Sequence, residues 1–205
     1  MRRTLVLFAH PALEKSRVHS RLLAALPPRP ELTVHDLYEQ YPEYWIDVDR
    51  EKALLTTHDL IVMQHPFYWY STPPLLKQWM DLVLEHGWAY GAGGTALRGK
   101  WLINVVSTGG SERAYQREGH NRFTVRELLA PIEQTARLCG MSYLPPYVVF
   151  GSHRLDPPDI EREAEAFGRA MALLATAPLD PAALDGEATL NAALASPQQL
   201  GEVPA

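Results

Sequence analysis

Short, uninterrupted apolar runs recur along this chain, and they constrain its fold more than any other feature. Residues 4–9 read Thr-Leu-Val-Leu-Phe-Ala, without the polar alternation of a strand that has one face in water. Runs of similar length occur at 32–37, 59–64, 100–107 and 143–150. Strands covered on both faces are typical of parallel sheets packed between helices. These runs therefore predict a five-stranded parallel sheet.

Segments with helical periodicity separate the apolar runs, at 16–26, 49–57, 73–86, 124–139 and 158–175. Strand followed by helix, repeated five times, predicts a doubly wound α/β domain. The last run contains Pro145 and Pro146, which lack the N–H of a ladder hydrogen bond and so favour an edge position.

Composition excludes several classes of protein. A net charge of −5 leaves no general basic field, so we expect no nucleic-acid partner. A single cysteine, Cys139, excludes an intramolecular disulfide and a four-cysteine metal cluster. No histidine pair stands at metal-ligand spacing beside a carboxylate, so we expect no metal. The first apolar run is too short for a secretory signal, and we expect a cytoplasmic protein.

The composition changes near residue 175. Residues 1–175 carry the strand and helix signals, whereas 176–205 are rich in Ala and Pro and poor in aromatic residues. We therefore expect a cofactor-binding domain over 1–175 and a loosely attached tail over 176–205 with one or two short helical turns.

Ligands of open α/β sheets bind beyond the carboxyl ends of the strands. After the first run, His10 precedes a helix that Ser16 is suited to cap, and the N–H groups of Arg17, Val18 and His19 would face an anion. The segment predicts a phosphate site, although a simple helix cap with His10 filling a turn explains it equally well. Neither a Walker loop nor a Gly-x-Gly-x-x-Gly motif is present here, which disfavours nucleoside triphosphates and Rossmann dinucleotides.

Four aromatic residues follow the third apolar run. Pro66 is succeeded by Phe67, Tyr68, Trp69 and Tyr70. Large rings at a strand end indicate walls for a flat ligand such as an isoalloxazine, and the alternative is a dimer contact or a loop covering the core.

Paired glycines follow the fourth run, in the sequence Ser107, Thr108, Gly109, Gly110, and they permit close approach of the backbone to a ligand. The three loops together fit flavin mononucleotide, FMN.

Tyr115 and His120 lie further along the chain. Near the pyrimidine edge of a flavin, they could donate hydrogen bonds to the charge that develops when hydride arrives at N5. We therefore name them as catalytic candidates, against the alternative that they are ordinary loop residues.

These segments also resemble the flavodoxin-like NAD(P)H quinone oxidoreductases, and within them the ancillary proteins of glutathione-gated potassium efflux systems. The resemblance runs from about Leu5 to Leu174 and is strongest at 65–79 and 86–100. It implies a sheet in the order 2-1-3-4-5, FMN (or alternatively FAD) as cofactor, NAD(P)H as co-substrate, and a homodimer with flavin at the interface. Trp79, Trp88 and Tyr90 are candidates for that interface.

The resemblance also implies roles for individual residues. His10 and residues 16–19 would hold the phosphate and ribityl chain, 67–70 would contact the ring, and 107–110 would contact its pyrimidine side. Tyr115 and His120 fall near the pair that stabilises reduced flavin in related diaphorases. The chain departs from the family pattern at His19, commonly Asn, and at Ser111, often Gly.

The first functional hypothesis is an FMN-dependent NAD(P)H:quinone oxidoreductase. The second is a regulatory subunit of a glutathione-gated potassium/proton antiporter, held at the inner face of the membrane by the antiporter's cytoplasmic domain. A flavin reductase or azoreductase is the third.

Overall fold

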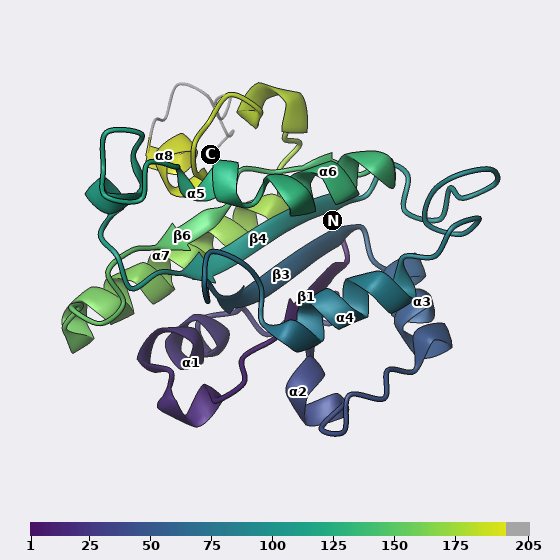
Figure 1. Ribbon diagram of the computed structural model, residues 1–205, viewed down its shortest axis with the longest axis horizontal. Helices are drawn as coiled ribbons and strands as arrows, with labels where there is room; N and C mark the ends of the chain where they lie inside the picture. The colour runs from purple at the N-terminus through teal and green to yellow at the C-terminus, as the bar shows by residue number, and fades with distance from the viewer. Residues whose placement is uncertain (196–205) are drawn as a thin grey trace.

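The structure is a computed structural model that describes residues 1–195 (Figure 1). Its strands are β1 (Thr4–Phe8), β2 (Leu32–Asp36), β3 (Leu60–Pro66), β4 (Trp101–Ser107), β5 (Ser142–Tyr143) and β6 (Tyr147–Val149). Its α-helices are α1 (Arg17–Ala24), α2 (Leu37–Gln40), α3 (Val48–Thr57), α4 (Pro74–Val83), α5 (Val125–Leu128), α6 (Ala130–Leu138), α7 (Pro157–Thr176) and α8 (Leu190–Ala195). Short 3-10 turns are η1 (Leu13–Lys15), η2 (Glu112–Tyr115) and η3 (Pro181–Leu184).

The strands form one parallel sheet in the order β2-β1-β3-β4-β5, which confirms the expected topology. The predicted fifth strand is divided in two, because Pro145 and Pro146 cannot donate to the ladder. Both halves pair with β4, with Tyr143 opposite Leu102 and Tyr147 opposite Val105. The predicted helix over 124–139 is likewise divided into α5 and α6, with Pro131 in the first turn of α6.

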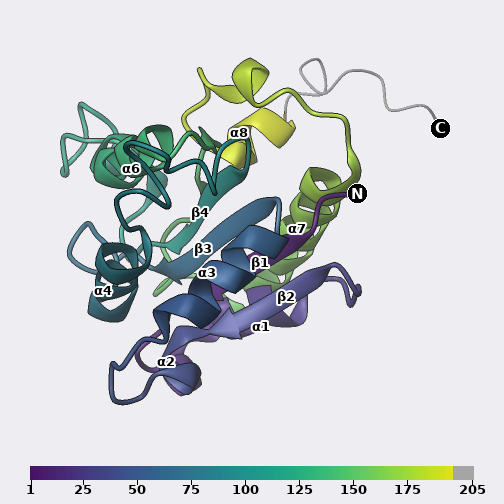
Figure 2. The same cartoon turned by 90° about the vertical axis from the view of Figure 1, so that its right-hand side faces the viewer.

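Alternate residues of the strands feed two separate cores. Leu5 and Leu7 on β1 point into a core closed by α3, α4 and α6, whereas Val6 and Phe8 point into one closed by α1, α7 and α8. Figure 2 shows α4 and α6 on one side of the sheet and α7 on the other. The sheet is therefore covered on both faces, as the continuous apolar runs predict.

The segment that follows α7 packs against the sheet, contrary to the expectation of a loose tail. Leu184 and Leu190 are buried there. The side-chain amide of Asn191 accepts a hydrogen bond from the Val148 N–H at 2.8 Å and donates to the Val148 carbonyl at 3.2 Å. Asn191 thus satisfies backbone groups of β6 that a further strand would otherwise pair.

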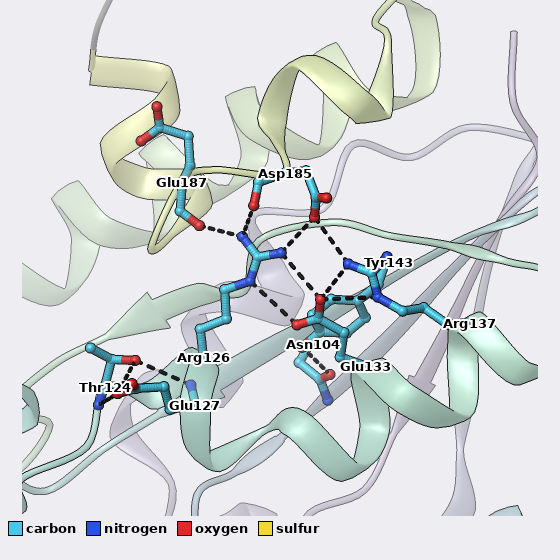
Figure 3. Close-up of polar contacts among 9 residues, drawn as sticks. All are labelled: Asn104, Thr124, Arg126, Glu127, Glu133, Arg137, Tyr143, Asp185 and Glu187. Carbon is cyan, nitrogen blue, oxygen red and sulfur yellow. Dashed lines mark hydrogen bonds and ion pairs between the residues drawn. The ribbon is translucent and has the colours of Figure 1, made fainter.

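A cluster of charged side chains on α5 and α6 also binds the segment that follows α7 (Figure 3). Arg126 donates to the backbone carbonyls of Asp185 and Glu187 and to the Asp185 carboxylate, and it also pairs with Glu133. Arg137 bridges Glu133 and Asp185. The apolar and polar contacts together explain why an Ala- and Pro-rich sequence packs against the rest of the domain over residues 177–195. Residues 196–205 of the expected tail lie outside the described residues.

Within residues 1–195, no helix is both long enough and apolar enough to cross a membrane.

Candidate functional site

A cavity of about 560 Å³ opens beyond the carboxyl ends of β1, β3 and β4. This is the edge where open α/β sheets bind ligands. The lining combines the turn before α1 and the first residues of that helix, the loop after β3, Ser107 and Gly109 at the end of β4, and the loop after β6: His10, Ala12, Lys15, Ser16, Arg17, Val18, Pro66, Phe67, Tyr68, Trp69, Ser107, Gly109, Ser152 and His153. The three loops singled out in the sequence therefore meet at one place.

One end of the cavity is formed by the N-terminus of α1. Ser16 has extended backbone angles and caps the helix, and its hydroxyl accepts the His19 N–H at 3.0 Å. The expectation that three N–H groups face an anion is thus corrected to two, because His19 is already satisfied. The N–H groups of Arg17 and Val18 have no acceptor within residues 1–195. With the Lys15 side chain nearby, this end favours an anion.

His10 adds a further donor. Its Nδ1 accepts the Ala12 N–H at 3.1 Å, so the proton of the neutral ring lies on Nε2. Burial lowers the pKa of His10, which keeps the ring neutral near pH 7. His10 is thus a neutral N–H donor in the cavity wall.

The His19 ring lies behind this wall and is fully buried. Its Nε2 is 2.9 Å from Ser107 Oγ and its Nδ1 is 3.4 Å from Gln64 Nε2. Burial holds the pKa of His19 well below the ordinary histidine value. His19 is therefore in contact with a residue that lines the cavity, and does not line the cavity itself.

The loop after β3 supplies the aromatic wall. Phe67 is buried, Tyr68 is 46% exposed and Trp69 is 93% exposed, and all three line the cavity. Tyr70 does not line it; its hydroxyl donates to Asn121 Oδ1 at 3.3 Å. Trp69 and Tyr70 have φ of 48° and 63°, in the left-handed region that is unfavourable for bulky residues. Such strain at exposed rings is typical of functional loops.

A buried polar chain anchors the base of this loop. Tyr143 donates to Asn104 Oδ1 at 3.0 Å, Asn104 donates to His65 Nε2 at 3.1 Å, and His65 donates to the Pro66 carbonyl at 3.0 Å. Burial lowers the pKa of His65 to about 4, so the ring is neutral. These three hydrogen bonds link β5 and β4 to the end of β3, which carries the aromatic wall.

The side chains of His153 and Tyr115 pack closely against the glycine pair after β4. A Cβ on Gly109 would lie 2.9 Å from His153 Cδ2, and one on Gly110 would lie 3.1 Å from Tyr115 Cε2. Gly109 lines the cavity, but Gly110 and Thr108 do not; the Thr108 hydroxyl donates to the Gly110 carbonyl at 2.9 Å. The backbone here must therefore remain free of side chains for the two loops to meet.

Sequence reasoning missed Ser152 and His153, which complete the cavity beside Gly109. They follow β6, and the rule that ligands bind beyond the carboxyl ends of strands could have identified them.

The two catalytic candidates lie outside the cavity lining. Tyr115 is 6% exposed and lies between Phe67 and Phe150, with ring centroids 6.2 Å and 6.1 Å away. Burial raises the pKa of Tyr115, so its hydroxyl stays protonated at neutral pH and can donate. His120 is exposed on the loop between η2 and α5. The catalytic roles of both residues remain predictions.

A second buried cluster lies away from the cavity, and we call it the Glu51 cluster. Glu51 on α3 is fully buried and accepts hydrogen bonds from His35 at 2.8 Å, Tyr41 at 2.6 Å and Trp79 at 2.8 Å. Burial raises the pKa of Glu51, but the three hydrogen bonds outweigh it and leave the pKa below the ordinary value. Trp79 is 1% exposed and cannot form the interface we expected of it. Trp88 and Tyr90 are partly buried against the same core.

Comparison with known proteins identifies the family. A family model described as "Flavodoxin-like fold" matches residues 2–171. The chain belongs to this family. The match and the observed strand order confirm the predicted fold class. The segment after 171, which includes η3 and α8, lies outside the matched range.

Two curated relatives share close to half of their residues with this chain. An uncharacterized NAD(P)H oxidoreductase, YrkL of Bacillus subtilis (strain 168), is 47% identical over 163 residues, which cover 80% of this chain and 94% of the relative. The glutathione-regulated potassium-efflux system ancillary protein KefG of Pectobacterium carotovorum is 44% identical over 168 residues, which cover 82% and 92%.

Two solved structures are also similar to this chain in both sequence and fold. General stress protein 14 of Treponema denticola, in complex with FMN, is 40% identical with a TM-score of 0.80, covering 84% of this chain and 99% of that one. A protein titled NADPH-quinone reductase from P. pentosaceus is 36% identical with a TM-score of 0.76, covering 87% and 99%.

Proposed function

We propose that this protein is an FMN-dependent NAD(P)H:quinone oxidoreductase. The observation that carries the proposal is the composition of the cavity at the strand ends: free donors at the α1 end and aromatic rings at the other side. Relatives named as NAD(P)H oxidoreductase and NADPH-quinone reductase, and one crystallised with FMN, support the same conclusion.

The residues of the cavity fit FMN. The Arg17 and Val18 N–H groups and the Lys15 ammonium suit a phosphate dianion, since each is a donor and none is an acceptor. Phe67, Tyr68 and Trp69 suit a flat aromatic ring. FMN fits this description without the adenylate half of FAD, so we favour FMN.

Bound FMN would supply the redox chemistry, because its ring takes up a hydride from NAD(P)H and returns two electrons to a quinone. The protein contributes binding, orientation and hydrogen bonds. The backbone at Gly109, which lines the cavity, allows close approach to the ring, and the protonated hydroxyl of Tyr115, which packs against Gly110 behind the lining, is our candidate for a further donor. The exposed Trp69 provides a stacking surface for flat substrates at the open side.

We further propose that the active form is a homodimer. Trp69 and Trp45 are 93% and 86% exposed, and Tyr44, Tyr68 and Tyr70 are each at least 38% exposed. Exposed rings of this size, some of them on strained backbone, indicate a surface that another chain or a ligand covers. A second copy would bury them and close the open side of the cavity.

The test is direct. Purified protein should turn yellow with FMN and oxidise NAD(P)H when menadione or benzoquinone is added. A protein that stays colourless after incubation with FMN, and does not oxidise NAD(P)H with either quinone, would refute the proposal. Comparison with azo dyes and free flavin as acceptors separates quinone reduction from azoreductase and flavin reductase activity.

The similarity to KefG supports a second function, regulation of a potassium/proton antiporter from the cytoplasmic side of the membrane. The two functions are separable by Tyr115→Phe, which should lower quinone reduction. Unchanged potassium efflux in cells carrying that variant would favour a regulatory role independent of turnover.

A further inference from the structure

The buried ring of His19 connects two parts of the cavity wall. Its own backbone N–H is bound by Ser16 in the first turn of α1, and its side chain reaches Ser107 at the end of β4. Ser107 lines the cavity, whereas His19 is completely buried. The hydrogen bond from the His19 ring to the cavity lining goes to Ser107, and the ring also packs edge-on against that of His10, with centroids 5.4 Å apart.

The placement of the Gln64 amide, whose nitrogen faces His19 while its oxygen has no partner within residues 1–195, indicates which nitrogen of His19 carries the proton. Gln64 Nε2 can only donate, and it lies 3.4 Å from His19 Nδ1, so Nδ1 is the acceptor. The ring is neutral, so its proton lies on Nε2 and is donated to Ser107 Oγ at 2.9 Å. A hydroxyl that accepts this hydrogen bond keeps its own hydrogen free to donate elsewhere.

We propose that His19 is a positioning residue that makes the Ser107 hydroxyl a hydrogen-bond donor to an acceptor oxygen in the sugar-phosphate part of the bound cofactor. The direction of donation runs from Gln64 to His19 to Ser107 and then into the cavity. Together with the Arg17 and Val18 N–H groups and His10 Nε2–H, the Ser107 hydroxyl gives this end of the cavity a set of convergent donors. The inference rests on the proposed binding of FMN.

Another buried histidine provides a matched control. His58 Nε2 also lies 2.9 Å from a hydroxyl, that of Thr33, but its Nδ1 lies 2.7 Å from the Leu54 carbonyl. A carbonyl only accepts, so His58 carries its proton on Nδ1 and accepts from Thr33. The two histidine–hydroxyl pairs thus have opposite polarity, and the His58 pair lies outside the cavity lining.

The first test is the tautomer of His19 in the protein without cofactor. Nitrogen-15 correlation spectra of the imidazole rings should show His19 protonated on Nε2 and His58 protonated on Nδ1, with assignments from spectra of His19→Phe and His58→Phe. A His19 proton on Nδ1 would mean that Ser107 donates to His19, and it would overturn the proposal.

The second test is the FMN affinity of four variants. Ser107→Ala and His19→Phe should each weaken FMN binding about tenfold, the effect of one hydrogen bond to a charged or strongly polar group. The double variant should bind FMN no more weakly than Ser107→Ala alone, because His19 acts through Ser107. Additive losses would contradict that route. His58→Phe and Thr33→Ala should leave FMN affinity unchanged.

The outcomes separate this inference from the proposed function. Wild-type protein that binds no FMN refutes the function, whereas wild-type protein that binds FMN with unchanged affinity in Ser107→Ala refutes only the role of His19 and Ser107. If His19→Phe does not fold, the tautomer measurement on wild-type protein and the Ser107→Ala titration still decide the question.

Discussion

The Glu51 cluster and the donor end of the cavity both contain buried histidines, His35 in the first and His10 and His19 in the second, yet they differ in whether their donors have acceptors. In the Glu51 cluster, one carboxylate receives three hydrogen bonds from His35, Tyr41 and Trp79, and the charge is satisfied within the fold. At the cavity, the Arg17 and Val18 N–H groups have no acceptor within residues 1–195. The comparison teaches that buried polarity alone does not mark a site; unmatched donors at a cavity do.

This difference predicts that the Glu51 cluster governs stability and the cavity governs binding. Glu51→Ala leaves three buried donors without their acceptor, so the free energy of unfolding should fall by about 3 kcal/mol. Urea denaturation measures it, with the exposed Asp49→Ala on the same helix as the control, expected to lose less than about 1 kcal/mol. An FMN affinity that collapses in the folded fraction of Glu51→Ala would break the proposed separation.

Lowering the pH should remove the stability that the two regions contribute in different pH ranges. The folded-state pKa values of His19 and His65 lie below the ordinary value, so the unfolded chain takes up protons first and stability falls as pH drops below about 6.5. Glu51 also has a lowered pKa, and as a carboxylate it loses its contribution only below about pH 4.5.

Between pH 7 and pH 5.5, wild-type protein should thus lose about 2 kcal/mol, at up to 1.4 kcal/mol per pH unit for each histidine. His19→Phe should reduce that slope and Glu51→Gln should not. Urea denaturation at both pH values measures this loss of stability. An equal loss in wild type and His19→Phe would contradict the lowered pKa of His19 in the folded protein.

The unmatched N–H of Arg17 can be removed without disturbing the helix. Proline is well tolerated at the first helical position, and Ser16 already has the extended backbone that precedes a proline. Arg17→Pro lacks the N–H, whereas Arg17→Ala keeps it. FMN should bind Arg17→Pro about tenfold more weakly than Arg17→Ala, with little difference in stability between the two. Equal affinities by fluorescence titration would argue against a phosphate at this helix end.

The smallest expected change in stability concerns the aromatic wall. Trp69→Gly relieves the left-handed backbone at an almost fully exposed ring, so it should leave the free energy of unfolding unchanged or raise it by up to about 1 kcal/mol. The same variant should weaken FMN binding and dimer formation. Flavin titration measures the FMN affinity and sedimentation measures dimer formation. If both are unchanged in Trp69→Gly, Trp69 contributes neither to FMN binding nor to the dimer.

Local signals account for what the sequence predicted well. The parallel strands follow from continuous apolar runs, and the α1 end of the cavity follows from a capping serine after a strand. What the sequence did not predict depends on contacts between distant segments. Gln64 meets His19, His35 meets Glu51, and Asn191 meets Val148 only after the chain has folded.

The tail shows the same limit. Its composition resembles that of a loose segment, but Arg126 and the open edge of β6 provide partners that composition cannot reveal. Residues 143–150 are mostly apolar, and this predicts one strand. The missing N–H groups of Pro145 and Pro146 divide it into β5 and β6.

The most direct test of the account is a paired equilibrium titration of the wild-type protein with FMN and with riboflavin, which differ only in the phosphate. The account predicts that FMN binds at least about a hundredfold more tightly, because the donor end of the cavity has its acceptors only when the phosphate is present. Equal affinity for the two flavins, or no binding of either, would contradict it.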